Sequence, residues 1–334
     1  MPPNNIGFVG CGHITTTALA PQAAALADDY RCRAFADIDA ARSAGACAKF
    51  SGAYHATDVT RLLEDDDLDA VAICTLPDTH AELACEFLAR GKHVLIQKPA
   101  AITYDQCRRL VAAERRSSAR AMVAYCYRLS PLVRQIAETI AQPRLIYLRM
   151  MSRDLAASHA HYLANPALAG GGPLLELACH NVDLACVLAR SEPVRVRATG
   201  GNMGHPGVDV IDNFVMTVEF VNGAVASLLS GDCGGADFAR KWYSEVFGDG
   251  VTAIIDGFRR LIFAGKRSET IDYDYNVGIG LDRDMAVFRD VVLGRSPSPA
   301  SAAEGVVATL LMLKAYDSLH SDRIETIELA EYLS

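Results

Sequence analysis

The chain has 334 residues, of which 51% are hydrophobic and 22% charged, and its formal net charge is −8. This length allows two domains with separate cores. The acidic balance argues against nucleic acid or an anionic membrane as a partner, since both bind basic surfaces, and no segment approaches the roughly 20 apolar residues of a membrane span.

The N-terminus and the cysteines favour a cytoplasmic protein. The opening MPPNNIGFVG lacks the basic region and long apolar run of a signal peptide. The ten cysteines are scattered and form no C-x-x-C pair. Some, such as Cys74 in VAICTL, lie in apolar runs where a free thiol packs as a small core residue. We therefore expect reduced cysteines and a cytoplasmic location.

Short apolar runs alternate with alanine-rich segments over the first third of the chain. Strands are expected at residues 6–9, 33–36, 70–74, 93–96 and 120–124. Helices are expected between them, at residues 18–27, 40–50, 79–90 and 104–117. Such alternation indicates right-handed β-α-β units and a parallel sheet. We therefore expect a doubly wound Rossmann domain over residues 1–124.

The first strand leads into the turn Gly10-Cys11-Gly12-His13-Ile14-Thr15. Gly10 permits a tight turn, and Gly12 lets a pyrophosphate approach the N-terminus of the next helix, which begins around His13 and Ile14. Thr15 replaces the third glycine of the usual fingerprint. These residues are expected to bind a dinucleotide.

The second strand ends at Asp37, where an acid typically binds the adenosine ribose hydroxyls. A carboxylate there repels a 2′-phosphate, so NAD is predicted over NADP. The alternative is that an aspartate here only caps the following helix.

Two further strand ends are expected at the same edge of the sheet, where ligands of such folds bind. One carries the run Thr75-Leu76-Pro77-Asp78-Thr79-His80, and the other carries Gln97-Lys98-Pro99. The proline disfavours helix at Lys98 and holds it extended. The alternative for Gln97-Lys98-Pro99 is a solvated lysine at a strand end with no specific role, and the pattern alone is explained equally well in this way.

Together, the glycine turn, Asp37, the T-x-P-x-x-H run and the lysine-proline pair resemble the Gfo/Idh/MocA family of oxidoreductases. The resemblance implies that Lys98 binds substrate and assists hydride transfer. It also places Thr75, Leu76, His80 and Gln97 on the cofactor side of the site. Gln97 stands where the family usually has a glutamate. Because glutamine adds no negative charge, we expect Lys98 to be somewhat easier to deprotonate than it would be beside a glutamate.

The second half predicts an α+β domain, residues 125–334, with a large, open and mainly antiparallel sheet. Turn signals such as Asn222-Gly223 separate adjacent strand-like runs. The runs lie at residues 145–151, 194–200, 210–220, 224–231, 242–247, 251–256 and 261–263. A helix at about 302–319 is expected to pack back on the first domain, and the sheet is expected to form a homodimer or homotetramer.

The segment GGGPLLELACHNVDLACVL, residues 170–188, carries the acid–base candidates. Glu176 and His180 are four residues apart and so share one face of a helix. The family pattern maps onto Gly172, Glu176, His180 and Asp183, which implies His180 as general base and Glu176 as a substrate contact or orienting acid. A surface ion pair is the alternative. No metal site is expected, because zinc needs three or four ligands.

The resemblance also places substrate contacts at Tyr127 and Arg128, in the crossover between domains, and Asp212 begins a strand that faces the same site. These residues imply an NAD-dependent dehydrogenase, or the reverse ketoreductase, acting on a hydroxyl of a cyclic polyol, sugar or sugar derivative. Two alternatives stay open: a glycosidase-type relative that retains NAD, and a sensor without catalysis.

Overall fold

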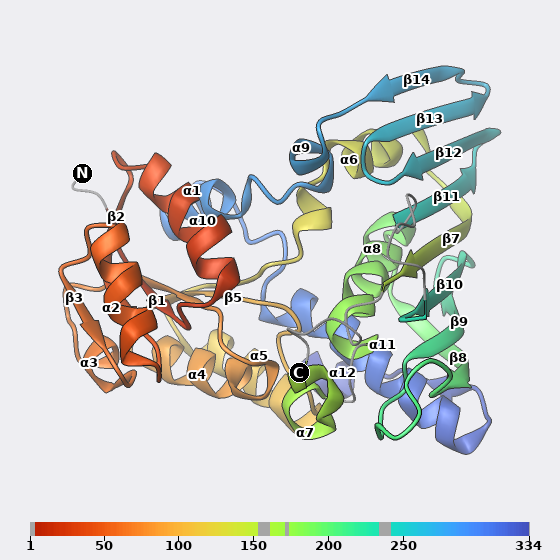
Figure 1. Cartoon of the computed structure of the whole chain (residues 1–334). Coiled ribbons are helices and arrows are strands. Elements are labelled where there is room, and N and C mark those ends of the chain that lie inside the picture. The colour runs from red at the N-terminus through yellow and green to blue at the C-terminus, as the bar shows by residue number, and fades with distance from the viewer. Residues whose placement is uncertain (1–3, 153–160, 171–173, 234–241, 334) are drawn as a thin grey trace.

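Two β-sheets, each with its own helices, make up the fold (Figure 1). The computed structural model describes residues 4–152, 161–170, 174–233 and 242–333. The first sheet is complete by Val123, and the second begins at Pro143. The predicted fold class, a parallel sheet followed by a large, mainly antiparallel one, is confirmed.

The first sheet has six parallel strands in the order β3-β2-β1-β4-β5-β6. Its strands are β1 (Asn4–Val9), β2 (Tyr30–Ala36), β3 (Tyr54–Ala56), β4 (Ala70–Ile73), β5 (His93–Ile96) and β6 (Ala121–Val123). From β1 the chain adds strands first towards one edge of the sheet (β2 and β3) and then towards the other (β4 to β6). The change of side between β1 and β4 creates a crevice at the carboxyl ends of these two strands. The short strand β3 was not predicted, because three residues, two half-buried and one exposed, are too few to carry a periodic signal.

Three helices of this layer begin at residues that commonly start a helix, either a capping side chain or a proline in the first turn. The helices of the layer are η1 (Thr15–Leu19), α1 (Ala20–Ala25), α2 (Ala40–Lys49), α3 (Thr60–Leu63), α4 (Pro77–Ala89) and α5 (Tyr104–Arg116). The side chain of Asp39 accepts backbone N–H groups at the start of α2, Thr103 does the same for α5, and Pro77 opens α4.

The second sheet has nine strands in the order β14-β13-β12-β11-β7-β10-β9-β8-β15. They are β7 (Pro143–Met151), β8 (Pro193–Gly201), β9 (Asn213–Phe220), β10 (Val225–Gly231), β11 (Trp242–Gly248), β12 (Val251–Asp256), β13 (Arg260–Gly265), β14 (Glu269–Asp272) and β15 (Glu325–Thr326). Neighbouring strands are antiparallel except β7 and β10, which are parallel.

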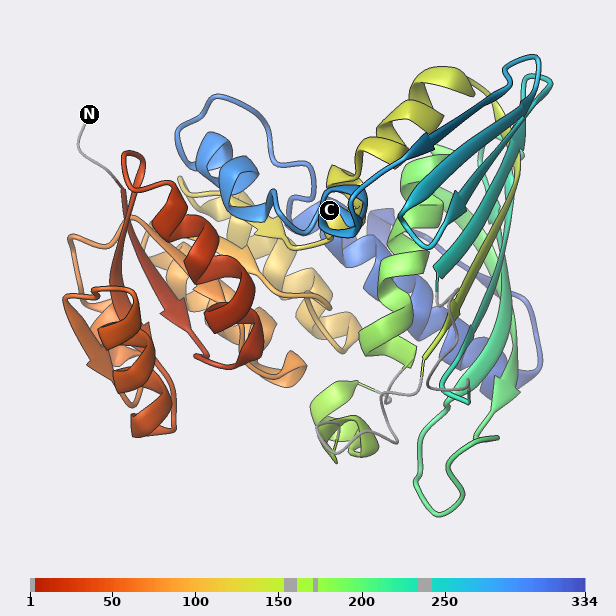
Figure 2. The same cartoon turned by 45° about the horizontal axis from the view of Figure 1, so that its top comes forward.

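Helices of the second half lie on the side of this sheet that faces the first (Figure 2). They are η2 (Cys126–Leu129), α6 (Pro131–Thr139), η3 (His161–Ala164), α7 (Pro166–Ala169), η4 (Leu174–Ala178), α8 (Cys179–Ala189), α9 (Tyr275–Ile279), α10 (Asp284–Val292), α11 (Ala302–Ser321) and α12 (Ala330–Leu333). Figure 2 shows the sheet nearly edge-on, and among the described residues no helix covers its opposite face.

The end of the chain ties the two layers together. Helix α11 contacts α8 and β8 of the second half and α5 and β6 of the first, as expected for a helix that packs back. Helix α12 packs on α5, and α10 packs on α1. The domain boundary predicted after residue 124 falls between β6 and η2 and stays a prediction.

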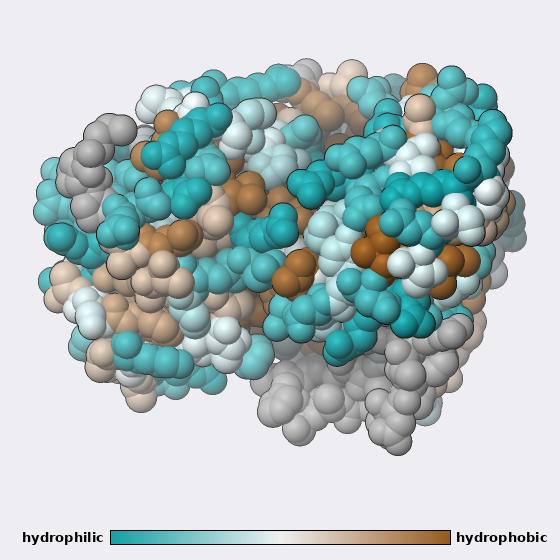
Figure 3. Space-filling view, turned by 90° about the horizontal axis from the view of Figure 1, so that it is seen from above, coloured by the Kyte–Doolittle hydropathy of each residue, from teal (hydrophilic) through white to brown (hydrophobic). Residues whose placement is uncertain are grey.

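The visible surface is largely hydrophilic. Seen from above, hydrophobic residues lie in small groups, some of them where the two halves meet (Figure 3). Among the described residues, no helix has the length and hydrophobicity needed to cross a membrane.

Candidate functional site

The glycine turn after β1 is shaped for a close approach by a ligand. Gly10 has φ +86°, and a Cβ added there would lie 2.5 Å from the Cys74 carbonyl oxygen, so no other residue fits. A Cβ added at Gly12 would meet no atom within 4 Å, which leaves open space above the turn. Thr15, in place of the third glycine, is buried and its hydroxyl donates to the Gly10 carbonyl at 2.5 Å.

Asp37 lies beside this turn, at the end of β2. One carboxylate oxygen accepts the N–H of Cys11 at 2.7 Å, and the other accepts the N–H of Asp39 at 2.9 Å. It is Asp39, not Asp37, whose side chain caps α2. The capping alternative for Asp37 is therefore wrong, and its carboxylate is oriented towards the glycine turn.

A pocket of about 700 Å³ extends over this edge of the first sheet. Five predicted cofactor residues line it: Gly10, Gly12, Asp37, Thr75 and Leu76. Other lining residues were not predicted and include Ile38, Arg42, Val59, Leu83 and Tyr162. The volume is in the range of ligand pockets, and the walls are mainly apolar with a few polar groups.

Lys98 and Glu176 contact each other, although 78 residues separate them in the chain. The Lys98 ammonium forms an ion pair with the Glu176 carboxylate and donates to the Glu176 backbone carbonyl at 2.8 Å. Each side chain is only 13% exposed. The turn after β5 and the helical segment η4 thus form one polar centre.

Glu176 controls the charge of Lys98. Burial lowers the pKa of the ammonium, but the Glu176 carboxylate, together with Cys179 and Tyr162, more than offsets burial, so the pKa of Lys98 is raised. The expectation drawn from Gln97, which compares this lysine with one beside a glutamate, stays a prediction. A carboxylate is missing beside Lys98 in sequence, but one from the second half contacts it in space.

His180 lies one turn beyond Glu176, at the start of α8, against an aromatic cluster. Its ring stacks on Tyr127 with centroids 4.6 Å apart and meets the ring of Tyr125 edge-on at 6.0 Å. Tyr127 is itself buried and packs against Phe258 and Trp242. The structure therefore gives Tyr127 a role in orienting the His180 ring, and its predicted substrate contact is not supported.

Arg128 and Asp212 do not have the roles expected for them. The Arg128 guanidinium is engaged by both Asp183 carboxylate oxygens and by the Pro299 carbonyl, so its donors are occupied inside the protein. Asp212 is fully buried and accepts the backbone N–H groups of Met203 and Gly204 at 2.7 Å. It organises the connection between β8 and β9, so both side chains are engaged inside the protein and neither is placed to contact a substrate.

The remaining predicted cofactor residues lie outside the pocket wall. His13 and Ile14 are exposed at the start of the first helical segment, and Gln97 donates its backbone N–H to the Ile73 carbonyl at 2.9 Å. His80 is buried, and its ring faces two backbone carbonyls. Gly172 lies outside the described residues.

Among the residues that the sequence did not indicate, Tyr162 has the clearest position. It belongs to η3, in the second half of the chain, yet it lines the pocket of the first half. Its hydroxyl also raises the pKa of Lys98, after the larger contributions of Glu176 and Cys179 and against the effect of burial. No motif marks it, because its place depends on α7 packing against α4.

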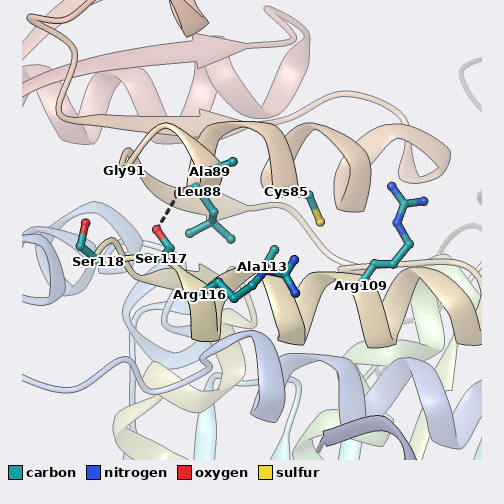
Figure 4. A pocket seen from close by; sticks show the side chains of 9 residues that line it. All are labelled: Cys85, Leu88, Ala89, Gly91, Arg109, Ala113, Arg116, Ser117 and Ser118. Carbon is teal, nitrogen blue, oxygen red and sulfur yellow. Dashed lines mark hydrogen bonds between the residues drawn. The ribbon is translucent and has the colours of Figure 1, made fainter.

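A second hollow lies between α4 and α5, and none of the predicted cofactor, catalytic or substrate residues lines it (Figure 4). Arg109 and Arg116 are at its rim, and the Ser117 hydroxyl donates to the Leu88 carbonyl at 2.6 Å. Arg109 is already paired with the Glu82 carboxylate through two 2.7 Å bonds. The hollow is therefore a groove between helices.

Comparison with protein families separates the chain into two matched regions. Residues 4–125 match a family described as an oxidoreductase family with an NAD-binding Rossmann fold, and residues 134–252 match the Gfo/Idh/MocA C-terminal domain. The chain belongs to the Gfo/Idh/MocA oxidoreductase family. The predicted family, the oxidoreductase class and the NAD-binding fold are thereby confirmed.

Relatives within this family include two inositol dehydrogenases. Inositol 2-dehydrogenase 2 of Saccharopolyspora erythraea is 30% identical over 67% of this chain and 65% of its own length. Myo-inositol 2-dehydrogenase of Thermotoga maritima is 24% identical over 97% of this chain and 98% of its own. A solved structure of levoglucosan dehydrogenase with NADH and levoglucosan has a TM-score of 0.86 at 22% identity, covering 97% of this chain and 99% of that one.

The pocket fits the NAD that a Gfo/Idh/MocA family member implies. The open space above Gly12 and the start of η1 suit a pyrophosphate, and the Asp37 carboxylate suits ribose hydroxyls. Ile38, which is 96% exposed, offers an apolar surface at the same wall.

Two glycine variants separate folding from nucleotide binding. Gly10→Ala should lower the melting temperature, because its Cβ collides with the Cys74 carbonyl. Gly12→Ala should leave the melting temperature unchanged but weaken NADH binding by about tenfold or more, because its Cβ enters the space of the phosphate. Thermal unfolding and NADH fluorescence titration measure the two effects. Unchanged NADH affinity in Gly12→Ala would contradict this placement.

Proposed function

We propose that this chain transfers a hydride between NAD and a secondary hydroxyl or ketone of a cyclic polyol, sugar or sugar derivative. The observation that carries the proposal is the Lys98 ammonium held on Glu176 and within electrostatic reach of Tyr162, which lines the nucleotide pocket. The names of the inositol and levoglucosan dehydrogenases among its relatives support this class of substrate.

Lys98 is proposed to bind the reacting oxygen. An ammonium has three N–H donors, and Glu176 takes two of them through its carboxylate and its carbonyl. One donor is left for a substrate oxygen. Because the pKa of Lys98 is raised, the side chain stays charged at neutral pH and stabilises a developing alkoxide rather than acting as a base.

His180 is proposed as the general base that takes the hydroxyl proton. An ordinary imidazole titrates near pH 6.5 and so can accept a proton at neutral pH. Its ring is held against Tyr127 on the helix turn that follows Glu176. Glu176 is proposed to fix Lys98 and to border the substrate. NAD, when bound in the pocket, supplies the hydride acceptor.

The activity is tested by offering inositols, sugars and keto-sugars with NAD or NADH to the purified protein. Turnover is followed by absorbance of the reduced nicotinamide. A substrate whose oxidation or reduction changes this absorbance supports the proposal. Release of a leaving group without net NADH formation would instead indicate a glycosidase-type reaction.

Lys98→Met should lower turnover by about a hundredfold or more, because one preorganised donor to the developing charge is lost. NADH binding should persist, since the pocket wall does not include Lys98. Lys266→Met removes an exposed lysine just after β13 and serves as the control. Near wild-type turnover in Lys98→Met would refute the proposed role.

NAD is proposed as the preferred cofactor because the Asp37 carboxylate repels a 2′-phosphate. Arg42 also lines the pocket, so Asp37→Ser should weaken NADH binding and strengthen NADPH binding. Asp105→Ser, which removes an exposed carboxylate on α5, is the control. Fluorescence titration measures both affinities, and tighter NADPH than NADH binding by the wild-type protein would overturn the preference.

A second copy of the chain is proposed to pack on the open face of the nine-stranded sheet. Strand register places apolar side chains side by side on this face, among them Leu145 with Val225 and Leu229 with Val215. Leu145 and Val215 are each 46% exposed. Most homo-oligomers are closed and symmetric, which suits a self-complementary face.

Sedimentation at micromolar concentration should give a dimer or tetramer for the wild-type protein. Leu145→Glu combined with Val215→Glu should give a monomer with little change in melting temperature, because both side chains point outward. A wild-type monomer would contradict this proposal.

A further inference from the structure

The ring of His80 lies between two strand-end turns that border the site. His80 is in the first turn of α4 and is 1% exposed. Its Nδ1 is 2.8 Å from the Pro99 carbonyl oxygen, and its Nε2 is 3.1 Å from the Thr75 carbonyl oxygen. One turn follows β4 and lines the nucleotide pocket, and the other follows β5 and carries Lys98.

Both partners of this ring are acceptors, which restricts its protonation state. A neutral imidazole has one N–H donor and so can donate to only one carbonyl. Burial lowers the pKa of His80 most strongly, and the positive charge of Lys98 acts in the same direction. The ring is therefore neutral near pH 7, and the shorter contact assigns its proton to Nδ1, donating to Pro99.

The backbone of the turn that carries Lys98 is packed against the core but makes few hydrogen bonds. Among the hydrogen bonds of the described residues, only the bond from His80 reaches the backbone of Lys98 or Pro99. Proline has no N–H to donate. The position of the Lys98 backbone determines whether its ammonium reaches Glu176, which belongs to a different layer of the fold.

We propose that His80 is a positioning residue: its Nδ1–H holds the Pro99 carbonyl and thereby keeps Lys98 on Glu176, beside the pocket wall at Thr75. This rests on the role proposed above for Lys98. A misplacement of a reacting group by about 1 Å can cost on the order of a hundredfold in rate. His80 thus acts through Lys98 rather than on the substrate.

Three substitutions test which ring nitrogen matters. The amide of His80→Asn places its N–H close to the position of Nδ1, and the longer His80→Gln places it close to Nε2. His80→Phe keeps the ring and removes both nitrogens. The control is His93→Phe, at the opposite end of β5, where the His93 Nδ1 accepts only the Arg120 N–H at 3.2 Å.

In His80→Phe and His80→Gln, kcat should fall by about ten- to a hundredfold while the KM for substrate and the NADH affinity change little. His80→Asn should retain most of the activity, and His93→Phe should match the wild type. The proposal would be overturned if His80→Phe impaired kcat, substrate KM and NADH affinity to the same extent. It would also be overturned if His80→Asn and His80→Gln were equally active.

Two readouts do not depend on activity. Acetylation of Lys98 by acetic anhydride, followed by mass spectrometry against Lys266, should be several-fold faster in His80→Phe, because a lysine released from Glu176 loses its raised pKa. Nitrogen-15 NMR of the wild-type histidines should show His80 protonated at Nδ1 alone. Protonation at Nε2 alone would overturn the assignment even if a variant failed to fold.

The Lys98→Met variant separates this inference from the proposed function. If Lys98→Met keeps its turnover, the proposed function fails, and labelling and NMR still decide the position of His80. If Lys98→Met is inactive and His80→Phe is fully active, the proposed function stands and the role of His80 fails.

Discussion

The ion pair between Lys98 and Glu176 is the contact on which the rest of the site depends. A largely buried ammonium is costly unless an opposite charge contacts it. Here the ammonium comes from a turn of the parallel sheet and the carboxylate from a helical segment of the second half. Neither half can hold its charge in this position alone, so the site exists only when both layers are folded and packed.

A second buried ion pair fixes how the segment after the first sheet packs on the helices of the second half. Arg128 follows the last strand of the first sheet, and its guanidinium contacts Asp183 on α8 and the Pro299 carbonyl before α11. Such a pair adds little net stability, but its two-point geometry restricts how the elements pack. The aromatic cluster around Tyr127 lies directly beside it and supports His180. The orientation of the His180 ring is thus set where the segment after the first sheet packs on α8.

Much of the fold was predictable because it rests on local signals. The glycine turn, the acid after β2 and the apolar runs of the first sheet all have fixed spacing. Features that depend on contacts between distant parts of the chain were not predictable. They include the parallel pairing of β7 with β10 and the position of Tyr162 at the nucleotide pocket. Arg128 and Asp212 were misassigned because a sequence shows that a residue is charged but not whether internal partners already occupy it.

The distribution of charge between the halves has a further consequence for how such a protein can diversify. In this chain the first half supplies an uncharged neighbour, Gln97, and the second half supplies the counter-ion of the lysine. Exchanging the second half for that of a relative would therefore alter the basicity of Lys98 along with the surface proposed to border the substrate. The two proposed roles, binding the reacting oxygen and bordering the substrate, would change together, because both depend on one short helical segment.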